Sequence, residues 1–219
     1  FLSFANDFKV VIKSSHLIHF RHGQVHEFGQ GHQVAHGQHV AVRTEARDNS
    51  RRHLRHDGLR APFGLAAMDV ADMLGEIKDD DPHYAVTKLL CLENTISGKV
   101  QPQNHLEVLA NAAHKKNLKV HLDGARLFNA HIYTGASMES LTNCFDSISI
   151  CLSKGLGAPI GSLLVSDQTT IDKARRLRKM LGGGMRQVGV IASCGMYALK
   201  NNVKRLQEDH DNAKLLADG

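Results

Sequence analysis

A lysine and an aspartate stand where two segments of the chain could present them to one ligand. Lys154 follows the apolar segment 146–152 and is flanked by serine and small residues, while Asp123 follows the apolar segment 118–122, three residues before Arg126. A partly desolvated lysine has a lowered pKa and attacks carbonyl carbons. An aspartate can keep a heteroaromatic nitrogen protonated. Pyridoxal phosphate enzymes need both groups, and the pair therefore indicates a site for that cofactor.

Each of these residues also has a plainer interpretation. Lys154 could be a surface lysine on a glycine-rich turn, because buried lysines are rare. Asp123 could cap the helix that follows it, with Arg126 as its ion-pair partner. The residue types and their spacing leave both interpretations open.

The segments around these residues alternate between strand and helix patterns. Short apolar runs predict strands over 86–92, 118–122, 146–152 and 161–166. Apolar residues at helical spacing predict helices within 67–81, 104–117 (with Asn104 as N-cap), 168–181, 185–199 and 203–217. This alternation is typical of an α/β domain with a mainly parallel sheet between helices. Ligands bind beyond the carboxyl ends of parallel strands, where we expect Asp123 and Lys154, together with Glu93 and Asn94.

Composition argues against several classes of protein. The 219 residues are 42% hydrophobic, too apolar for a disordered chain, and no long apolar window predicts a membrane span. Four cysteines without a CxxC pair argue against a zinc ribbon or a disulfide framework and indicate reduced thiols in a cytosolic or organellar protein, and we expect a cytoplasmic one. The net charge of +5 is concentrated in the first 56 residues, which hold eight Lys and Arg against four Asp and Glu. We therefore expect no nucleic-acid partner for the rest of the chain.

Residues 1–63 differ from the rest of the chain in composition and in their apolar pattern. Nine of the 15 histidines fall within the first 56 residues, and glycine interrupts each short helix or strand pattern there. We predict an irregular, basic, His-rich segment over 1–63 and an α/β domain over 64–219. A zinc site within 16–56 is an alternative, but the histidines keep no regular spacing and we expect no metal. The chain begins without Met or a recognisable targeting signal, and we expect it to be a fragment.

Five long motifs carry a resemblance to one family. They are KLLCLENT (88–95), HLDGARLFNA (121–130), FDSISICLSKGLGAPIGSLLVSD (145–167), RRLRKMLGGGMRQVGV (175–190) and ALKNNVKRLQEDHDNA (198–213). In this order, over about residues 64–219, they resemble the low-specificity threonine aldolases, which are pyridoxal phosphate enzymes of the aspartate-aminotransferase fold type. The resemblance implies the large domain of a pyridoxal phosphate-dependent transferase-like fold, incomplete at both ends.

The resemblance also implies roles for individual residues. Lys154 would hold pyridoxal phosphate covalently, Asp123 would pair with the pyridine nitrogen, and Arg126 would lie near the phenolic oxygen and the substrate carboxylate. His83 would face the β-hydroxyl group of the substrate and act as the base. Arg186 would lie near the cofactor phosphate, across a subunit interface.

The reaction implied is a retro-aldol cleavage of L-threonine or L-allo-threonine. The substrate is a small β-hydroxy-α-amino acid, its Cα–Cβ bond breaks, and the products are glycine and acetaldehyde. The implied assembly is a homo-oligomer, a tetramer in the family, with a place in threonine catabolism and glycine biosynthesis.

The chain departs from the family pattern in three places. The Ser-Gly-Thr phosphate loop and the histidine that stacks on the ring have no match in residues 1–60, and Ile96 stands where the family has a histidine. The chain ends at Gly219, before the family's small C-terminal domain. Two alternatives therefore remain, an inactive truncated relic of the family and another pyridoxal phosphate reaction such as β-elimination or transamination.

Overall fold

The computed structural model describes residues 9–13, 40–43 and 68–219. Six strands lie within these residues: β1 (Lys9–Lys13), β2 (Val40–Arg43), β3 (Thr87–Glu93), β4 (Lys119–Asp123), β5 (Ser147–Cys151) and β6 (Ser162–Ser166). Seven helices accompany them: α1 (Val70–Gly75), α2 (Gln103–Lys115), α3 (Leu127–Thr134), α4 (Met138–Thr142), α5 (Gln168–Met180), α6 (Gly189–Asn201) and α7 (Leu206–Asp218).

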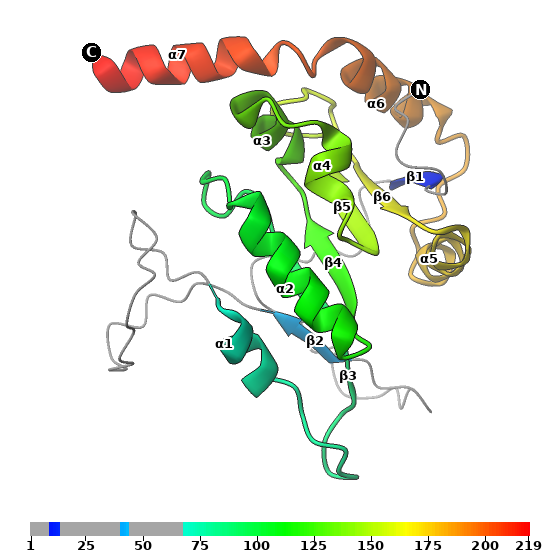
Figure 1. Ribbon diagram of the computed structural model, residues 1–219. Helices are drawn as coiled ribbons and strands as arrows, with labels where there is room; N and C mark the ends of the chain where they lie inside the picture. The colour runs from blue at the N-terminus through cyan, green and yellow to red at the C-terminus, as the bar shows by residue number, and fades with distance from the viewer. Residues whose placement is uncertain (1–8, 14–39, 44–67) are drawn as a thin grey trace.

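The strands form one sheet in the order β1-β6-β5-β4-β3-β2 (Figure 1). β2, β3, β4 and β5 pair in parallel, whereas β6 is antiparallel to both of its neighbours, β5 and β1. β6 can reverse because a ten-residue loop joins it directly to β5, without a crossover helix. The predicted α/β class with a mainly parallel sheet is therefore confirmed.

Two of the six strands lie in the segment 1–63. The sequences KVVIK of β1 and VAVR of β2 are rich in β-branched residues, which favour strands. β1 pairs with β6 and β2 with β3, and both strands stand at the edges of the sheet. In these two places the structure differs from the predicted irregular segment. The other residues of 1–63, including the histidines 16–39 of the alternative zinc site, lie outside the described residues.

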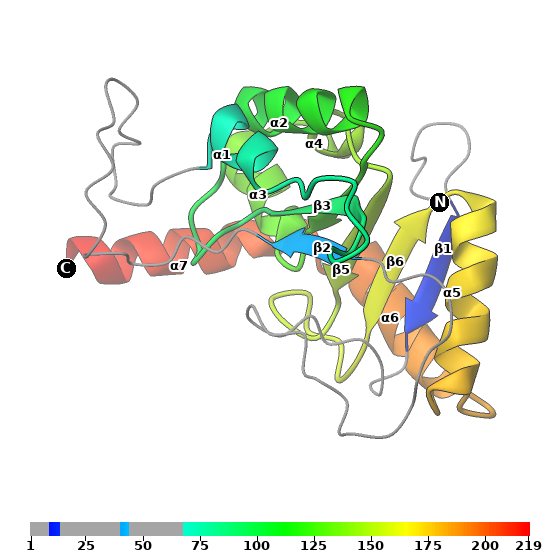
Figure 2. The same cartoon turned by 90° about the horizontal axis from the view of Figure 1, so that it is seen from below.

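Alternation along the central strands buries one face of the sheet. The buried set, at most 5% exposed, comprises Leu90, Leu92, Val120, Leu122, Ile148 and Ile150. Helices α1, α2 and α4 lie over one side of the sheet (Figure 2). The other face carries half-buried polar residues, among them His121, Asp123 and Ser149. The polar residues of this face that lie near the carboxyl ends of the strands can therefore line a site there.

The helix boundaries differ from prediction at the start of α2. Pro102, not Asn104, is the N-cap residue, and the Leu106 amide donates to the Pro102 carbonyl at 3.2 Å. Proline suits a helix start because its ring fixes φ and it has no amide hydrogen to lose. Asn104 lies within the first turn, where its side chain accepts from the His105 amide. The short helices α3 and α4 were not predicted, because eight and five residues give too little periodicity.

Candidate active site

The carboxyl ends of β3, β4 and β5 meet at one edge of the sheet. Glu93, Asp123 and Ser149 are register partners across these three strands. The Asn94 amide donates to the Asp123 carbonyl at 3.1 Å, and the Gly124 amide donates to the Ser149 carbonyl at 2.8 Å. The backbone on both sides of Asp123 is thus fixed by the neighbouring strands.

The Asp123 side chain turns back onto the start of α3. One carboxylate oxygen, Oδ1, accepts a hydrogen bond from the Ala125 amide at 3.1 Å. Within the described residues this is the hydrogen bond of the Asp123 carboxylate, and it uses Oδ1 but not Oδ2. Gly124 permits the tight turn, because a Cβ there would lie 3.1 Å from the Ser149 carbonyl oxygen. The interpretation of Asp123 as a local cap is therefore correct for one oxygen and leaves the ligand interpretation open for the other.

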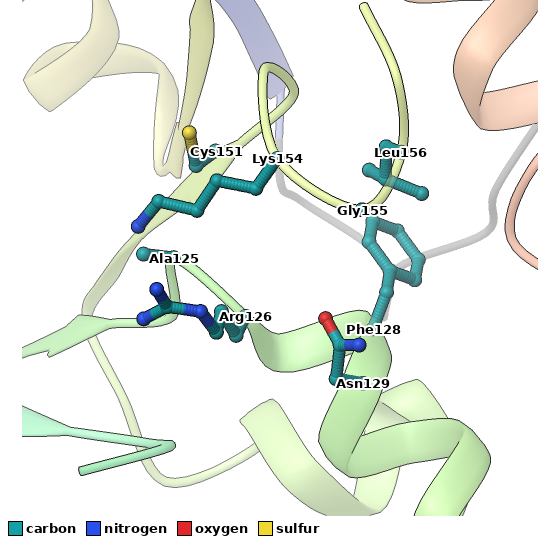
Figure 3. Close-up of a pocket in the computed structure, with 8 residues that line it drawn as sticks. All are labelled: Ala125, Arg126, Phe128, Asn129, Cys151, Lys154, Gly155 and Leu156. Carbon is teal, nitrogen blue, oxygen red and sulfur yellow. The ribbon is translucent and has the colours of Figure 1, made fainter. Parts of the chain in front are cut away.

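Lys154 and Arg126 flank a shallow, open hollow beyond this edge. Eight residues line it: Ala125, Arg126, Phe128, Asn129, Cys151, Lys154, Gly155 and Leu156. Figure 3 shows the side chains of Lys154 and Arg126 extending in the same direction on either side of Ala125. The structure therefore brings together Lys154 and Arg126, with Asp123 two residues before Ala125 in the same turn.

Lys154 lies in the loop between β5 and β6. The loop is closed by backbone bonds from the Leu152 amide to the Gly161 carbonyl at 3.0 Å and from the Ala158 amide to the Leu152 carbonyl at 3.1 Å. The Gly157 amide donates to the Lys154 carbonyl at 2.8 Å. The Lys154 side chain is exposed, as the interpretation of a surface lysine on a glycine-rich turn predicts. Lys154 lies three residues beyond the end of β5.

His83 is not brought to this edge. It lies between α1 and β3, before the first residue of β3, and so a strand of seven residues, roughly 20 Å long, carries the chain away from it toward Glu93. Its side chain is 88% exposed, and its ring Nδ1 lies 2.8 Å from Asp81 Oδ1. The backbone amide and the ring of His83 both hydrogen-bond to Asp81 and lower the pKa of that carboxyl group. Parallel strands thus place His83 and Lys154 at opposite edges of the sheet in this chain, and the role of His83 as the base stays a prediction.

Arg186 lies in the turn between α5 and α6 and is exposed. It is not among the residues that line the hollow beside Lys154. The expectation that Arg186 acts across a subunit interface stays a prediction.

Two buried polar groups at the same edge were not assigned a role from the sequence. Asn94 and Thr95 follow β3 and are 1% and 5% exposed. Asn94 Oδ1 accepts from the Gln101 amide at 3.2 Å, but Asn94 Nδ2 and Thr95 Oγ1 have no hydrogen-bond partner within the described structure. Unsatisfied buried polar atoms are uncommon and need an explanation, and a polar ligand at this edge is one. Their position directly after a strand was visible in the sequence, but their burial was not.

Residues 68–219 and the two edge strands lack two further classes of site. No group of three His, Cys, Asp or Glu side chains there could hold a metal ion. No helix within the same residues has both the length and the apolar character needed to cross a membrane.

Comparison with known proteins gives a family for the chain and several individual relatives. A family model described as beta-eliminating lyase matches residues 6–219. The match thus extends into the segment 1–63, in which no motif of the family was recognised from the sequence. The low specificity L-threonine aldolase of Escherichia coli O157:H7 is 57% identical over 158 residues, which are 72% of this chain and 47% of that protein. The probable low-specificity L-threonine aldolase 2 of Arabidopsis thaliana is 48% identical, over 64% of this chain and 40% of that protein.

The solved structure of threonine aldolase from Leishmania major has a similar fold, with a TM-score of 0.56 at 23% identity, over 64% of this chain and 42% of that one. The chain spans about half the length of the curated relatives that it matches.

Proposed function

The chain belongs to the beta-eliminating lyase family, and from this premise we propose that it is part of a pyridoxal phosphate-dependent aldehyde-lyase. The proposed reaction is retro-aldol cleavage of L-threonine or L-allo-threonine to glycine and acetaldehyde. The observation that carries the proposal is the grouping of the Lys154 amine, the Asp123 carboxylate and the Arg126 guanidinium at one edge of the sheet. Relatives with 57% and 48% identity bear the name of that activity, and this supports the choice of reaction.

The chemistry of these side chains fits the cofactor. An exposed amine can reach an aldehyde, a carboxylate can pair with a protonated ring nitrogen, and a guanidinium can bind a phenolate or carboxylate oxygen. The unpartnered Asn94 Nδ2 offers a further donor at the same edge. Pyridoxal phosphate, when bound, supplies a ring that accepts the electron pair left on Cα as the Cα–Cβ bond breaks.

Lys154, Asp123 and Arg126 would each have a separate role in this reaction. Lys154 would hold the cofactor through its amine. Asp123 would pair with the ring nitrogen through one carboxylate oxygen, while its other oxygen accepts from the Ala125 amide. Arg126, at the N-cap of α3, orients an anionic group of the substrate or cofactor. The proton of the β-hydroxyl group passes to a base that these three residues do not supply.

The wider expectations belong to the same proposal. We infer that copies of the protein associate, as a tetramer in which Arg186 reaches a neighbouring site, and that the enzyme works in the cytoplasm in threonine breakdown and glycine formation. Neither a nucleic acid nor a membrane has a place in this function.

The test of the proposal is the visible absorption of the purified chain with added pyridoxal phosphate. We expect an absorption band that disappears in Lys154→Ala and persists in Lys173→Ala, which removes another exposed lysine, on α5. Glycine and acetaldehyde should then form from L-allo-threonine. Loss of the band in neither variant would refute the role of Lys154. A band without any product would favour the inactive relic, and pyruvate as the product would favour β-elimination.

A further inference from the structure

The loop that carries Lys154 is held from behind by the junction between α6 and α7. Asn202 follows the last residue of α6, and its Nδ2 donates to the Leu156 carbonyl at 2.7 Å. Arg205 is the N-cap residue of α7, and its Nη2 donates to the Gly155 carbonyl at 3.2 Å. The carbonyl groups of the two residues directly after Lys154 are therefore bound by side chains about fifty residues away.

Packing at the same place leaves the loop little room to shift. A Cβ on Gly155 would lie 2.7 Å from Cδ2 of Leu206, which is fully buried. A Cβ on Gly195 of α6 would lie 2.9 Å from Cδ1 of Leu152. Glycine at both positions thus allows α6 and α7 to approach the loop more closely than any larger residue would permit.

The Lys154 side chain depends on this backbone for its direction. Within the described part of the chain no hydrogen bond holds the Lys154 amine itself, and the side chain is exposed. A side chain with four rotatable bonds explores a volume that is centred on its Cα atom. The junction fixes that Cα atom from one side, and the backbone bonds of Leu152 fix it from the other.

We propose that Asn202 is a positioning residue for Lys154, and that Arg205 and Leu206 complete the same support. Asn202 is not among the residues that line the hollow beside Lys154. Its bond to Leu156 holds the loop in the position from which the Lys154 side chain extends beside that of Arg126, over Ala125 (Figure 3). The proposal rests on the function proposed for Lys154.

The experiment compares two adjacent asparagines. Asn202→Asp keeps the shape of the side chain but replaces the donor with an acceptor that faces the Leu156 carbonyl. Asn201→Asp is the matched control, because Asn201 Nδ2 donates only within α6, to the Tyr197 carbonyl at 2.9 Å. Both variants are studied as the full chain, at a temperature where circular dichroism shows that each is folded.

The measurement is the rate of covalent attachment of pyridoxal phosphate to Lys154. The amine condenses with the aldehyde and releases water, borohydride then reduces the C=N bond, and peptide mapping gives the share of label at Lys154 and at the other lysines. We expect Asn202→Asp to slow attachment at Lys154 by about tenfold, since small misplacements of a reacting group have effects of at least this size. Labelling of the other lysines should not change, and a general loss of folding would change it.

The outcomes separate this proposal from the one on which it rests. Attachment at the wild-type rate in a folded Asn202→Asp protein would overturn the role of Asn202 alone. Failure of the wild-type chain to attach the cofactor at Lys154 would overturn both. If Asn202→Asp does not fold, Arg205→Ala decides the question against the control Lys204→Ala, with slower attachment expected only in the first.

Discussion

At the scale of single residues, a substitution of Asp123 separates an effect on activity from an effect on stability. Asp123→Asn keeps the Oδ1 acceptor for the Ala125 amide, and we expect the free energy of unfolding to change by less than about 1 kcal/mol. The substitution removes the negative charge proposed to face the ring nitrogen. We therefore expect glycine formation to fall by about a hundredfold or more, as for the loss of one well-placed electrostatic group.

The measurement pairs a glycine assay with urea unfolding. Asp211→Asn serves as the control, because Asp211 is exposed on α7 and accepts from the Gln207 side chain at 2.8 Å. Equal activity in both variants would contradict the role of Asp123. A large loss of stability in Asp123→Asn would instead mean that its contribution is structural.

Residue types and spacing could predict which residues lie at the carboxyl edge of the sheet, but not every residue that contacts them. Asp123 ends a strand and Lys154 follows one, and because the carboxyl ends of parallel strands lie at one edge, the sequence was sufficient to predict the edge for both. His83 precedes a strand, and the same rule sends it to the opposite edge, although the family resemblance had assigned it to the site. Asn202 could not be found, because its contact with Leu156 spans 46 residues and leaves no periodic signal.

At the scale of elements, the two halves of α7 differ in what they contribute. Leu206 is fully buried against the Lys154 loop, whereas Leu216 is 84% exposed on the part of the helix that extends beyond α3 (Figure 1). We expect Leu206→Ala to lower the free energy of unfolding by about 2 to 5 kcal/mol, the range for a buried leucine. Leu216→Ala should change it by less than about 0.5 kcal/mol.

Urea unfolding followed by circular dichroism measures both variants of α7. Each replaces a leucine by alanine in one helix, and helix propensity therefore affects them alike. Similar losses of stability in the two variants would contradict the packing of Leu206 described above.

Elements were predictable where their patterns were long. α2, α5, α6 and α7 have 13 residues each, enough for apolar spacing to indicate a helix. The edge strands β1 and β2, five and four residues long, were missed because they lie in the His-rich segment 1–63, for which an irregular structure was predicted as a whole. Their place in the sheet comes from pairing with β6 and β3, which only the tertiary structure specifies.

At the scale of the whole molecule, one aspartate ties together the edge of the sheet opposite Lys154. Asp146 stands directly before β5. Its side chain accepts from Lys119 Nζ at 2.7 Å, from His114 Nε2 at 2.8 Å and from the Val120 amide at 2.8 Å. Its carbonyl oxygen accepts from Ser166 Oγ at 2.7 Å. α2, β4, β5 and β6 are thus joined through a single residue.

These bonds make the stability of the whole domain depend on pH. Partial burial raises the pKa of Asp146, but the hydrogen bonds from Lys119, His114 and the Val120 amide together outweigh it, and the pKa lies below its ordinary value. A carboxyl group with a lower pKa in the folded state contributes stability above its unfolded pKa of 3.8, and this contribution is lost as the pH falls through the folded pKa. Asp146→Asn removes the charge, and the variant should lack this part of the pH dependence.

We expect Asp146→Asn to lower the free energy of unfolding at pH 7 by about 1 to 3 kcal/mol, the value of hydrogen bonds to a charged group. The difference from wild type should shrink as the pH is lowered below about 4, where the wild-type carboxyl group becomes protonated as well. Urea unfolding over this pH range gives the difference directly, and Asp172→Asn, which removes an exposed partner of Arg175 on α5, should be nearly neutral throughout. A difference that is constant with pH would mean that Asp146 stabilises the domain through its shape and not through its charge.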